Sequence, residues 1–158
     1  MSRVLTAVTM TIAGIAAGAQ ITSVYAGREA FWAIAAAGFG AALVWLVTGG
    51  HRAWHLPVSI AGLAGLLTGL QYLMPAPDGL LAAFGNAGAR LLTIAPPLPS
   101  RVDTLLLPVV ATWICVASGC ALAGSRRPAL AMLPPALLAT GMLVLVGPRR
   151  EAGYVPAA

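Results

Sequence analysis

The residue types that do chemistry are few in this chain. Cys115 and Cys120 lie five residues apart inside an apolar block, which turns them to different faces of a helix, and a membrane interior disfavours the reactive thiolate. His51 and His55 could share one helix face, but HRAWHL offers no Asp, Glu or Cys, and a metal site needs further ligands. We therefore expect inert thiols, loop or interfacial histidines beside the aromatic anchor Trp54, and no catalytic set, metal or cofactor.

The composition excludes an ordinary soluble domain. Of the 158 residues, 59% are hydrophobic and 8% are charged, whereas soluble domains carry about 25% charged residues to keep their surface wetted. All nine basic residues are Arg and stand singly or in pairs between apolar blocks, as at the ends of membrane spans. Nucleic-acid binding needs clustered basic residues. The expected partner is therefore the lipid bilayer, and no nucleic acid.

Five long uncharged blocks predict the fold. They run over residues 4–24, 30–50, 56–74, 104–124 and 129–147, and about 20 apolar residues carry a helix across the hydrocarbon core. In lipid only helices and closed barrels satisfy their backbone groups, and unbroken apolarity favours helices. We predict an all-α integral membrane protein: a single membrane domain over residues 1–158, with five transmembrane helices and one short interfacial amphipathic helix between spans 3 and 4.

The membrane orientation depends on the loops. Arg3 and the apolar run to Ala19 also fit a cleavable signal peptide, but apolar sequence continues to Val24, which favours an uncleaved span. The arginine count on the two sides, four against five, leaves the orientation open. The tight loop with Arg126 and Arg127 is the best cytoplasmic marker under the positive-inside rule. We expect a multi-pass protein of the bacterial cytoplasmic membrane with its N-terminus in the cytoplasm.

The connection between spans 3 and 4 contains the predicted interfacial helix, residues 79–92. Its apolar residues follow helical spacing, and they are Leu80, Leu81, Phe84, Ala87, Gly88, Leu91 and Leu92. Asp78 stands where an N-cap would. The helix is too short to span, so we expect it to lie flat in the membrane interface. Packing against a soluble partner domain is the alternative.

A proline corner over residues 94–103 follows this helix. Pro96, Pro97 and Pro99 lock φ and lack amide donors, so they stop the interfacial helix and turn the chain into the fourth span, for which Asp103 is a plausible cap. We expect the helix and corner together to form a docking surface. Its candidate residues are Leu81, Phe84, Leu91, Pro96, Pro97, Pro99 and Arg101.

Small residues predict where helices pack closely. Gly14 with Gly18 and Gly65 with Gly69 form two GxxxG pairs, which let helix backbones approach each other in lipid. The adjacent prolines 134 and 135 fall inside the predicted fifth span, where we expect a kink.

Two motifs resemble a known family. The segment TIAPPLP (residues 93–99) after an amphipathic helix and the segment RRPALAMLP (residues 126–134) before a span resemble the N-terminal membrane domain of actinobacterial transmembrane transglutaminase-like proteins. Ile94 stands where the family has an aromatic residue, and Met132 where it has a small one. The matching residues are Thr93, Ala95, Pro96, Pro97, Pro99, Arg126, Arg127, Pro128, Ala129, Leu130, Ala131 and Pro134.

The resemblance, which covers about residues 79–135, implies a function. The family carries a papain-like domain with a Cys-His-Asp triad outside the membrane, after its N-terminal spans. No residue of this chain matches that triad, so the activity is not expected here. We expect a non-catalytic membrane anchor or scaffold module that holds a membrane or extracytoplasmic protein. The alternative is a stand-alone small membrane protein, either a subunit of a larger complex or a permease-like component.

Overall fold

The computed structural model describes the chain except for residues 1–2, 50–51, 75–78, 94–97, 126–127 and 153–158. All regular elements of the described part are helical. In chain order they are α1 (Arg3–Ala19), the 3-10 helix η1 (Gln20–Val24), α2 (Glu29–Thr48), α3 (Arg52–Leu73), α4 (Gly79–Thr93), α5 (Val102–Ala123), the 3-10 helix η2 (Pro128–Met132) and α6 (Leu133–Ala152).

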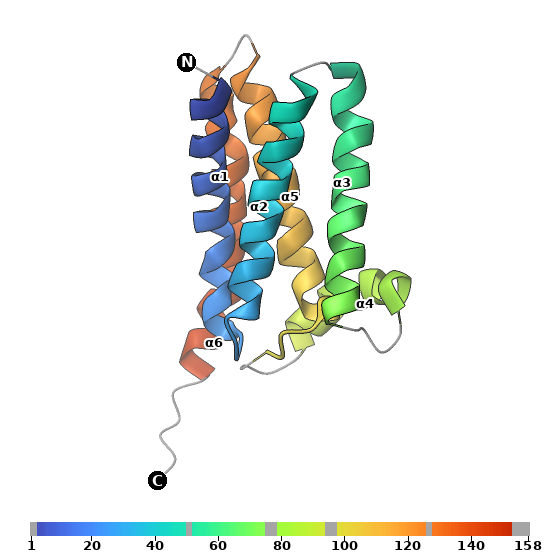
Figure 1. The fold of residues 1–158 in the computed structure, drawn as a ribbon. Helices are drawn as coiled ribbons and strands as arrows, with labels where there is room; N and C mark the ends of the chain where they lie inside the picture. Colours follow the sequence, from blue (N-terminus) through green and yellow to red (C-terminus); the bar gives the residue numbers. More distant parts are fainter. Residues whose placement is uncertain (1–2, 50–51, 75–78, 94–97, 126–127, 153–158) are drawn as a thin grey trace.

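Five of the helical segments are long and apolar enough to cross a membrane, which confirms the predicted all-α membrane fold. They run alternately up and down as one bundle in the order α1, α2, α3, α5 and α6 (Figure 1). The short α4 lies across one end of the bundle, beside the end of α3. We call this the lower end, as drawn in Figure 1; α1, α3 and α6 finish there, and α2 and α5 begin there.

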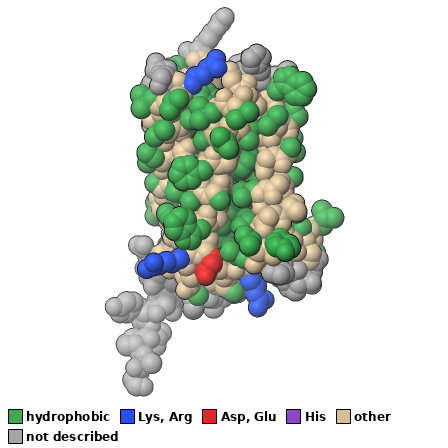
Figure 2. Space-filling view, viewed as in Figure 1, with side chains coloured by type: hydrophobic (Ala, Val, Ile, Leu, Met, Phe, Trp, Pro, Cys, Tyr) green, Lys and Arg blue, Asp and Glu red, His purple; other side chains and the backbone are tan. Residues whose placement is uncertain are grey.

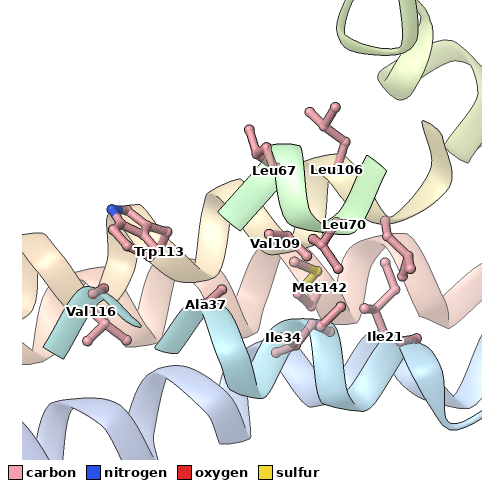
Figure 3. Close-up of a cluster of buried hydrophobic side chains, with 14 of the residues drawn as sticks. Ile21, Ile34, Ala37, Leu67, Leu70, Leu106, Val109, Trp113, Val116 and Met142 are labelled. Atoms are coloured by element: carbon pink, nitrogen blue, oxygen red, sulfur yellow. The ribbon is translucent and has the colours of Figure 1, made fainter. Parts of the chain in front are cut away.

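Helix α5 is the centre of the bundle and packs against α1, α2, α4 and α6. Of the apolar window of α5, 56% is buried inside the protein, compared with 17% for α3 and 22% for α6. The last two helices therefore offer most of their surface to their surroundings. Ile34 of α2, Val109 of α5 and Met142 of α6 meet in the apolar core (Figure 3).

The described side chains inside the bundle are almost entirely apolar. Thr11, Thr48 and Thr112 are buried, and each hydroxyl donates a hydrogen bond to a carbonyl one turn back in its own helix. Such local bonds satisfy a hydroxyl that lipid or protein would otherwise leave without a partner.

The structure adds local detail to two predicted spans and corrects the loop placement of His55. The first span ends in the 3-10 turn η1, in which hydroxyls bond carbonyls three residues back. His55 lies in a helix, because α3 begins at Arg52. Pro134 and Pro135 lie inside the fifth apolar span, Pro128–Val146, where the 3-10 helix η2 passes into α6 at Leu133, and the kink expected there stays a prediction. Prolines are tolerated in the first turn of a helix, where their missing N–H has no intrahelical acceptor.

Candidate functional site

Helix α4 divides its apolar residues between the bundle and the outside. Ala83 and Ala87 are each 3% exposed and pack into the core that α4 shares with α5. Leu81 and Phe84, two predicted docking residues, point away from the core and are 90% and 49% exposed. The predicted stripe is therefore split in two, with the alanines as the packing side.

Helix α4 begins at Gly79 and ends at Thr93. Gly79 opens the helix with a φ of 80°, a left-handed conformation that glycine adopts at little cost. The side chain of Leu91 lies outside the described residues, as does Asp78, the expected cap. Among the described side chains of α4, the exposed large apolar ones are Leu81 and Phe84.

The proline corner is hydrogen-bonded to the loop that joins the first two spans. Leu98 is fully buried and forms a parallel bridge with Tyr25. Its amide donates to the carbonyl of Val24 at 2.8 Å, and its carbonyl accepts from the amide of Ala26 at 3.1 Å. Pro96 and Pro97 lie outside the described residues. These two bonds hold segments more than 70 residues apart in the sequence side by side.

Tyr25 makes a second connection, to the start of α5. Its hydroxyl donates a hydrogen bond of 2.7 Å to the carbonyl of Thr104. In a regular helix that carbonyl would accept the amide of residue 108, but residue 108 is Pro and has no N–H. The tyrosine therefore supplies the donor that Pro108 removes, inside a buried part of the bundle.

The start of α5 is capped by a residue that the sequence did not indicate. The hydroxyl of Thr104 donates to the carbonyl of Pro99 at 2.7 Å and accepts the amide of Arg101 at 3.4 Å. Asp103, the expected cap, lies inside the first turn of α5 and is buried. A carboxylate in this first turn interacts favourably with the helix dipole. Arg101 is the N-cap residue, and its side chain is exposed.

Aromatic side chains mark both ends of the bundle. Trp32 at the start of α2 and Tyr72 at the end of α3 are exposed at the lower end, and Trp54 is exposed near the start of α3, at the upper end. Figure 2 shows charged side chains at the two ends and apolar side chains over the helices between them. Tryptophan and tyrosine concentrate at the headgroup level of membranes. Both ends of the bundle thus carry exposed aromatic side chains of the kind found at membrane interfaces.

Comparisons with protein families, with curated proteins and with solved structures find no match to this chain. The resemblance to transglutaminase-like proteins therefore depends on its two short motifs alone, and it stays a prediction. Within the first motif, Pro99 takes part in the corner described above. Arg126 and Arg127 of the second motif lie outside the described residues.

The two glycine pairs lie in different surroundings. A Cβ atom at Gly14 would collide with Val116 of α5, and one at Gly18 would collide with Thr112 of α5 and lie 2.9 Å from Ile34 of α2. These glycines allow α1 to approach its neighbours closely. By contrast, the Cβ positions of Gly65 and Gly69 face open space, with no atom of another described helix within 4 Å. The second pair makes no helix contact within the described part of the chain.

The packing of Trp113 against two glycines, Gly40 and Gly62, was not predicted from the sequence. We call the space that its indole fills the tryptophan slot. The indole of Trp113 on α5 lies 2.7 Å from the Cβ position of Gly40 on α2 and 3.0 Å from that of Gly62 on α3. Its ring N–H donates a hydrogen bond of 3.0 Å to the hydroxyl of Ser59. A buried tryptophan N–H usually needs an acceptor. The available signal was a large residue on one span and isolated glycines at mid-depth on two others.

The remaining candidates for chemistry stay apart. Cys115 and Cys120 are both free and buried in α5. His55 is half-buried in α3 and lines an apolar groove between α3 and α5. Among the described residues, no three His, Cys, Asp or Glu side chains come together in a metal-binding group. The candidate functional site is therefore the lower end of the bundle, which comprises α4, the corner and the start of α5.

Proposed function

We propose that the chain is a membrane anchor and scaffold module of a bacterial cytoplasmic membrane. In this proposal the N-terminus lies in the cytoplasm and the lower end lies at the extracytoplasmic surface. Helix α4 rests in the membrane interface there, and its exposed apolar residues hold a partner protein or a fused domain close to the membrane. The five spans provide the membrane anchor, and the lower end of the bundle provides the platform.

The observation that carries the proposal is the pair of exposed apolar side chains on a firmly held helix. Leu81 and Phe84 face outward while Ala83 and Ala87 fix α4 on α5. A clustered apolar surface that a protein leaves outside its own core is a common feature of interaction sites. Two such side chains on one rigid element can insert into a groove of a partner.

The hydrogen bonds that join the corner, the loop at Tyr25 and the start of α5 support a rigid platform. The corner is bonded to the loop at Tyr25, and Tyr25 is bonded to the start of α5. Binding to a preorganised surface avoids the entropic cost of ordering it on contact. Helix α6 also ends at the lower end (Figure 1). A domain joined after α6, as the transglutaminase resemblance implies, would therefore emerge on the same side as the platform.

Site-specific photocrosslinking in living bacterial cells tests this function. A photoreactive phenylalanine analogue replaces Leu81 or Phe84 in two variants, and Leu43 in a matched control. Leu43 is 61% exposed on α2, at a position between the two ends of the bundle. We expect crosslinks to one discrete protein from the two α4 positions and to lipid alone from position 43.

Two outcomes would contradict the proposal. Crosslinking of the α4 positions to lipid alone would mean that this face is only an apolar surface resting in the membrane. Equal crosslinking of position 43 to the same protein would mean that the contact is not directed by α4. The alternative function, a subunit of a larger complex or a permease-like component, stays a prediction.

A further inference from the structure

A second feature of the lower end is a hollow of about 600 Å³ between the start of α2, the end of α3 and the corner that precedes α5. Its polar lining comes from Glu29, Ser100 and Arg101, and its apolar lining from Leu73 and Met74. None of these residues lies on α4, and Arg101 is the one among them that was also a predicted docking residue. The hollow thus combines two opposite charges with an apolar wall.

Two charged side chains of opposite sign line the hollow among the residues that the structure describes. Within the described residues, neither Glu29 nor Arg101 makes an ion pair. The Glu29 carboxylate lies over Gly27, where any side chain would collide with it. The hydroxyl oxygen of Ser100 is buried and has no hydrogen-bond partner in the described structure. The hollow therefore offers one anionic group, one cationic group and one hydroxyl to a ligand.

The level of the hollow along the bundle axis indicates which ligands can reach it. Trp32 on α2 and Tyr72 on α3 are exposed close to the residues that line it. Exposed tryptophan and tyrosine mark the headgroup level of a bilayer. The molecules most concentrated at this level are phospholipids, whose phosphate pairs well with a guanidinium group.

We propose that this hollow binds the headgroup of a zwitterionic phospholipid that carries a primary ammonium group, namely phosphatidylethanolamine. Arg101 and the Ser100 hydroxyl bind the phosphate, and the Glu29 carboxylate accepts hydrogen bonds from the ammonium group. Opposite charges on the two sides of the hollow match the two charges of the headgroup. This site does not depend on the proposed scaffold function.

The lining discriminates against the other common headgroups. Choline has no N–H to donate, and quaternary ammonium groups are recognised by aromatic cages, whereas the described residues that line this hollow include no aromatic side chain. An anionic headgroup such as phosphatidylglycerol would satisfy Arg101 but would be repelled by the carboxylate of Glu29. Of these three headgroups, only ethanolamine satisfies both charges.

The adjoining surface of α3 can accept the acyl chains. Leu73 lines the hollow and is largely exposed. Gly69 and Gly65 follow at one-turn intervals along α3, and the Cβ position of each faces open space. A shallow track of this kind, leading from headgroup depth toward the hydrocarbon core, lets a chain lie close to the helix backbone. The exposed glycine pair thereby gains a role other than helix packing.

Native mass spectrometry of the full chain in detergent tests the proposal. Phosphatidylethanolamine, phosphatidylcholine and phosphatidylglycerol with identical acyl chains are titrated separately, and the protein-bound lipid is counted. A charge-assisted hydrogen bond corresponds to about a tenfold change in affinity. We expect phosphatidylethanolamine to bind about tenfold more tightly than phosphatidylcholine.

The variants separate the two charges. Glu29→Gln should remove the preference for phosphatidylethanolamine over phosphatidylcholine, because only the ethanolamine group donates to the carboxylate. Arg101→Gln should weaken both lipids by a similar factor, because both carry the phosphate. Glu29→Arg should shift the preference to phosphatidylglycerol, a gain that misfolding cannot produce. Arg3→Gln, which removes an exposed charge near the opposite end, is the matched control and should change nothing.

Three results would overturn the proposal. The first is equal retention of the three lipids by the unmodified chain, and the second is a preference for phosphatidylethanolamine that survives Glu29→Gln. The third concerns the source of the headgroup. If soluble phosphoethanolamine displaced the lipid at a concentration equal to that of the lipid itself, the hollow would be a site for a small soluble molecule.

Discussion

Removing one hydroxyl tests how the lower end is held together. Tyr25→Phe keeps the ring that packs in the core and deletes the donor to the Thr104 carbonyl. Because Pro108 has no N–H, that carbonyl loses the donor that stands in for the missing helical one. Tyr25 is only 7% exposed, so water does not readily replace the hydroxyl.

The expected magnitude follows from the cost of a buried unpaired carbonyl. Leaving such a group without a donor costs about 1–3 kcal/mol, so we expect Tyr25→Phe to lower the free energy of unfolding by that amount. Pro108→Ala restores an amide that can donate to the carbonyl of Thr104. In that background the destabilisation by Tyr25→Phe should be smaller by about 1 kcal/mol or more, since the carbonyl of Thr104 then has a helical donor.

The assay is equilibrium unfolding in mixed micelles of mild detergent and sodium dodecyl sulfate, followed by far-UV circular dichroism. The four proteins of the double-mutant cycle are compared under identical conditions. A coupling free energy of about 1 kcal/mol or more between positions 25 and 108 is predicted. Strictly additive effects would refute the reasoning, because they would show that the hydroxyl of Tyr25 does not substitute for the amide that Pro108 lacks.

Three further comparisons follow, the first two measured in the same unfolding assay and the third by proteolysis. Gly18→Leu should destabilise the bundle by about 1–3 kcal/mol through overpacking, since α5 and α2 side chains crowd its Cβ position; Gly65→Leu, which faces open space, should cost almost nothing, and equal costs would contradict the packing. Ser59→Ala should cost about 0.6 kcal/mol, because it removes the acceptor of a buried indole N–H; no change would mean that the bond contributes nothing. Ala83→Asp should detach α4 from α5, seen as new cleavage by added protease, whereas Leu81→Asp should leave α4 in place because its side chain is already outside the core.

The spans of this fold could be predicted from the sequence, because the bilayer imposes a simple rule. A helix must be apolar over about 20 residues to cross the hydrocarbon core, and charged residues mark the breaks between the apolar blocks of this chain. The contact made by Gly14 and Gly18 was also predictable, because small residues one turn apart are a common helix-packing motif.

The connections between distant segments could not be predicted in the same way. The bridge between Tyr25 and Leu98 joins two loops, and nothing in either loop indicates its partner. The slot for Trp113 needs two glycines on different helices to face it at one depth, which depends on the vertical register of the helices. GxxxG spacing was likewise insufficient for Gly65 and Gly69, because spacing does not say whether a neighbour lies opposite.

The central claim is that the five long helices cross a bilayer with the lower end at its surface. The most direct test is spin labelling of the chain in lipid nanodiscs, in a background in which Cys115 and Cys120 are replaced by Ala. Labels replace Phe39, which is 64% exposed between the two ends of α2, Leu81 on α4 and, as a reference near the opposite end, the exposed Arg3 at the start of α1. Collisions with apolar oxygen and with a water-soluble nickel complex then report the depth of each label. We predict that oxygen dominates at position 39 and that position 81 lies near the headgroups, whereas nickel access at position 39 equal to that at Arg3 would contradict the account.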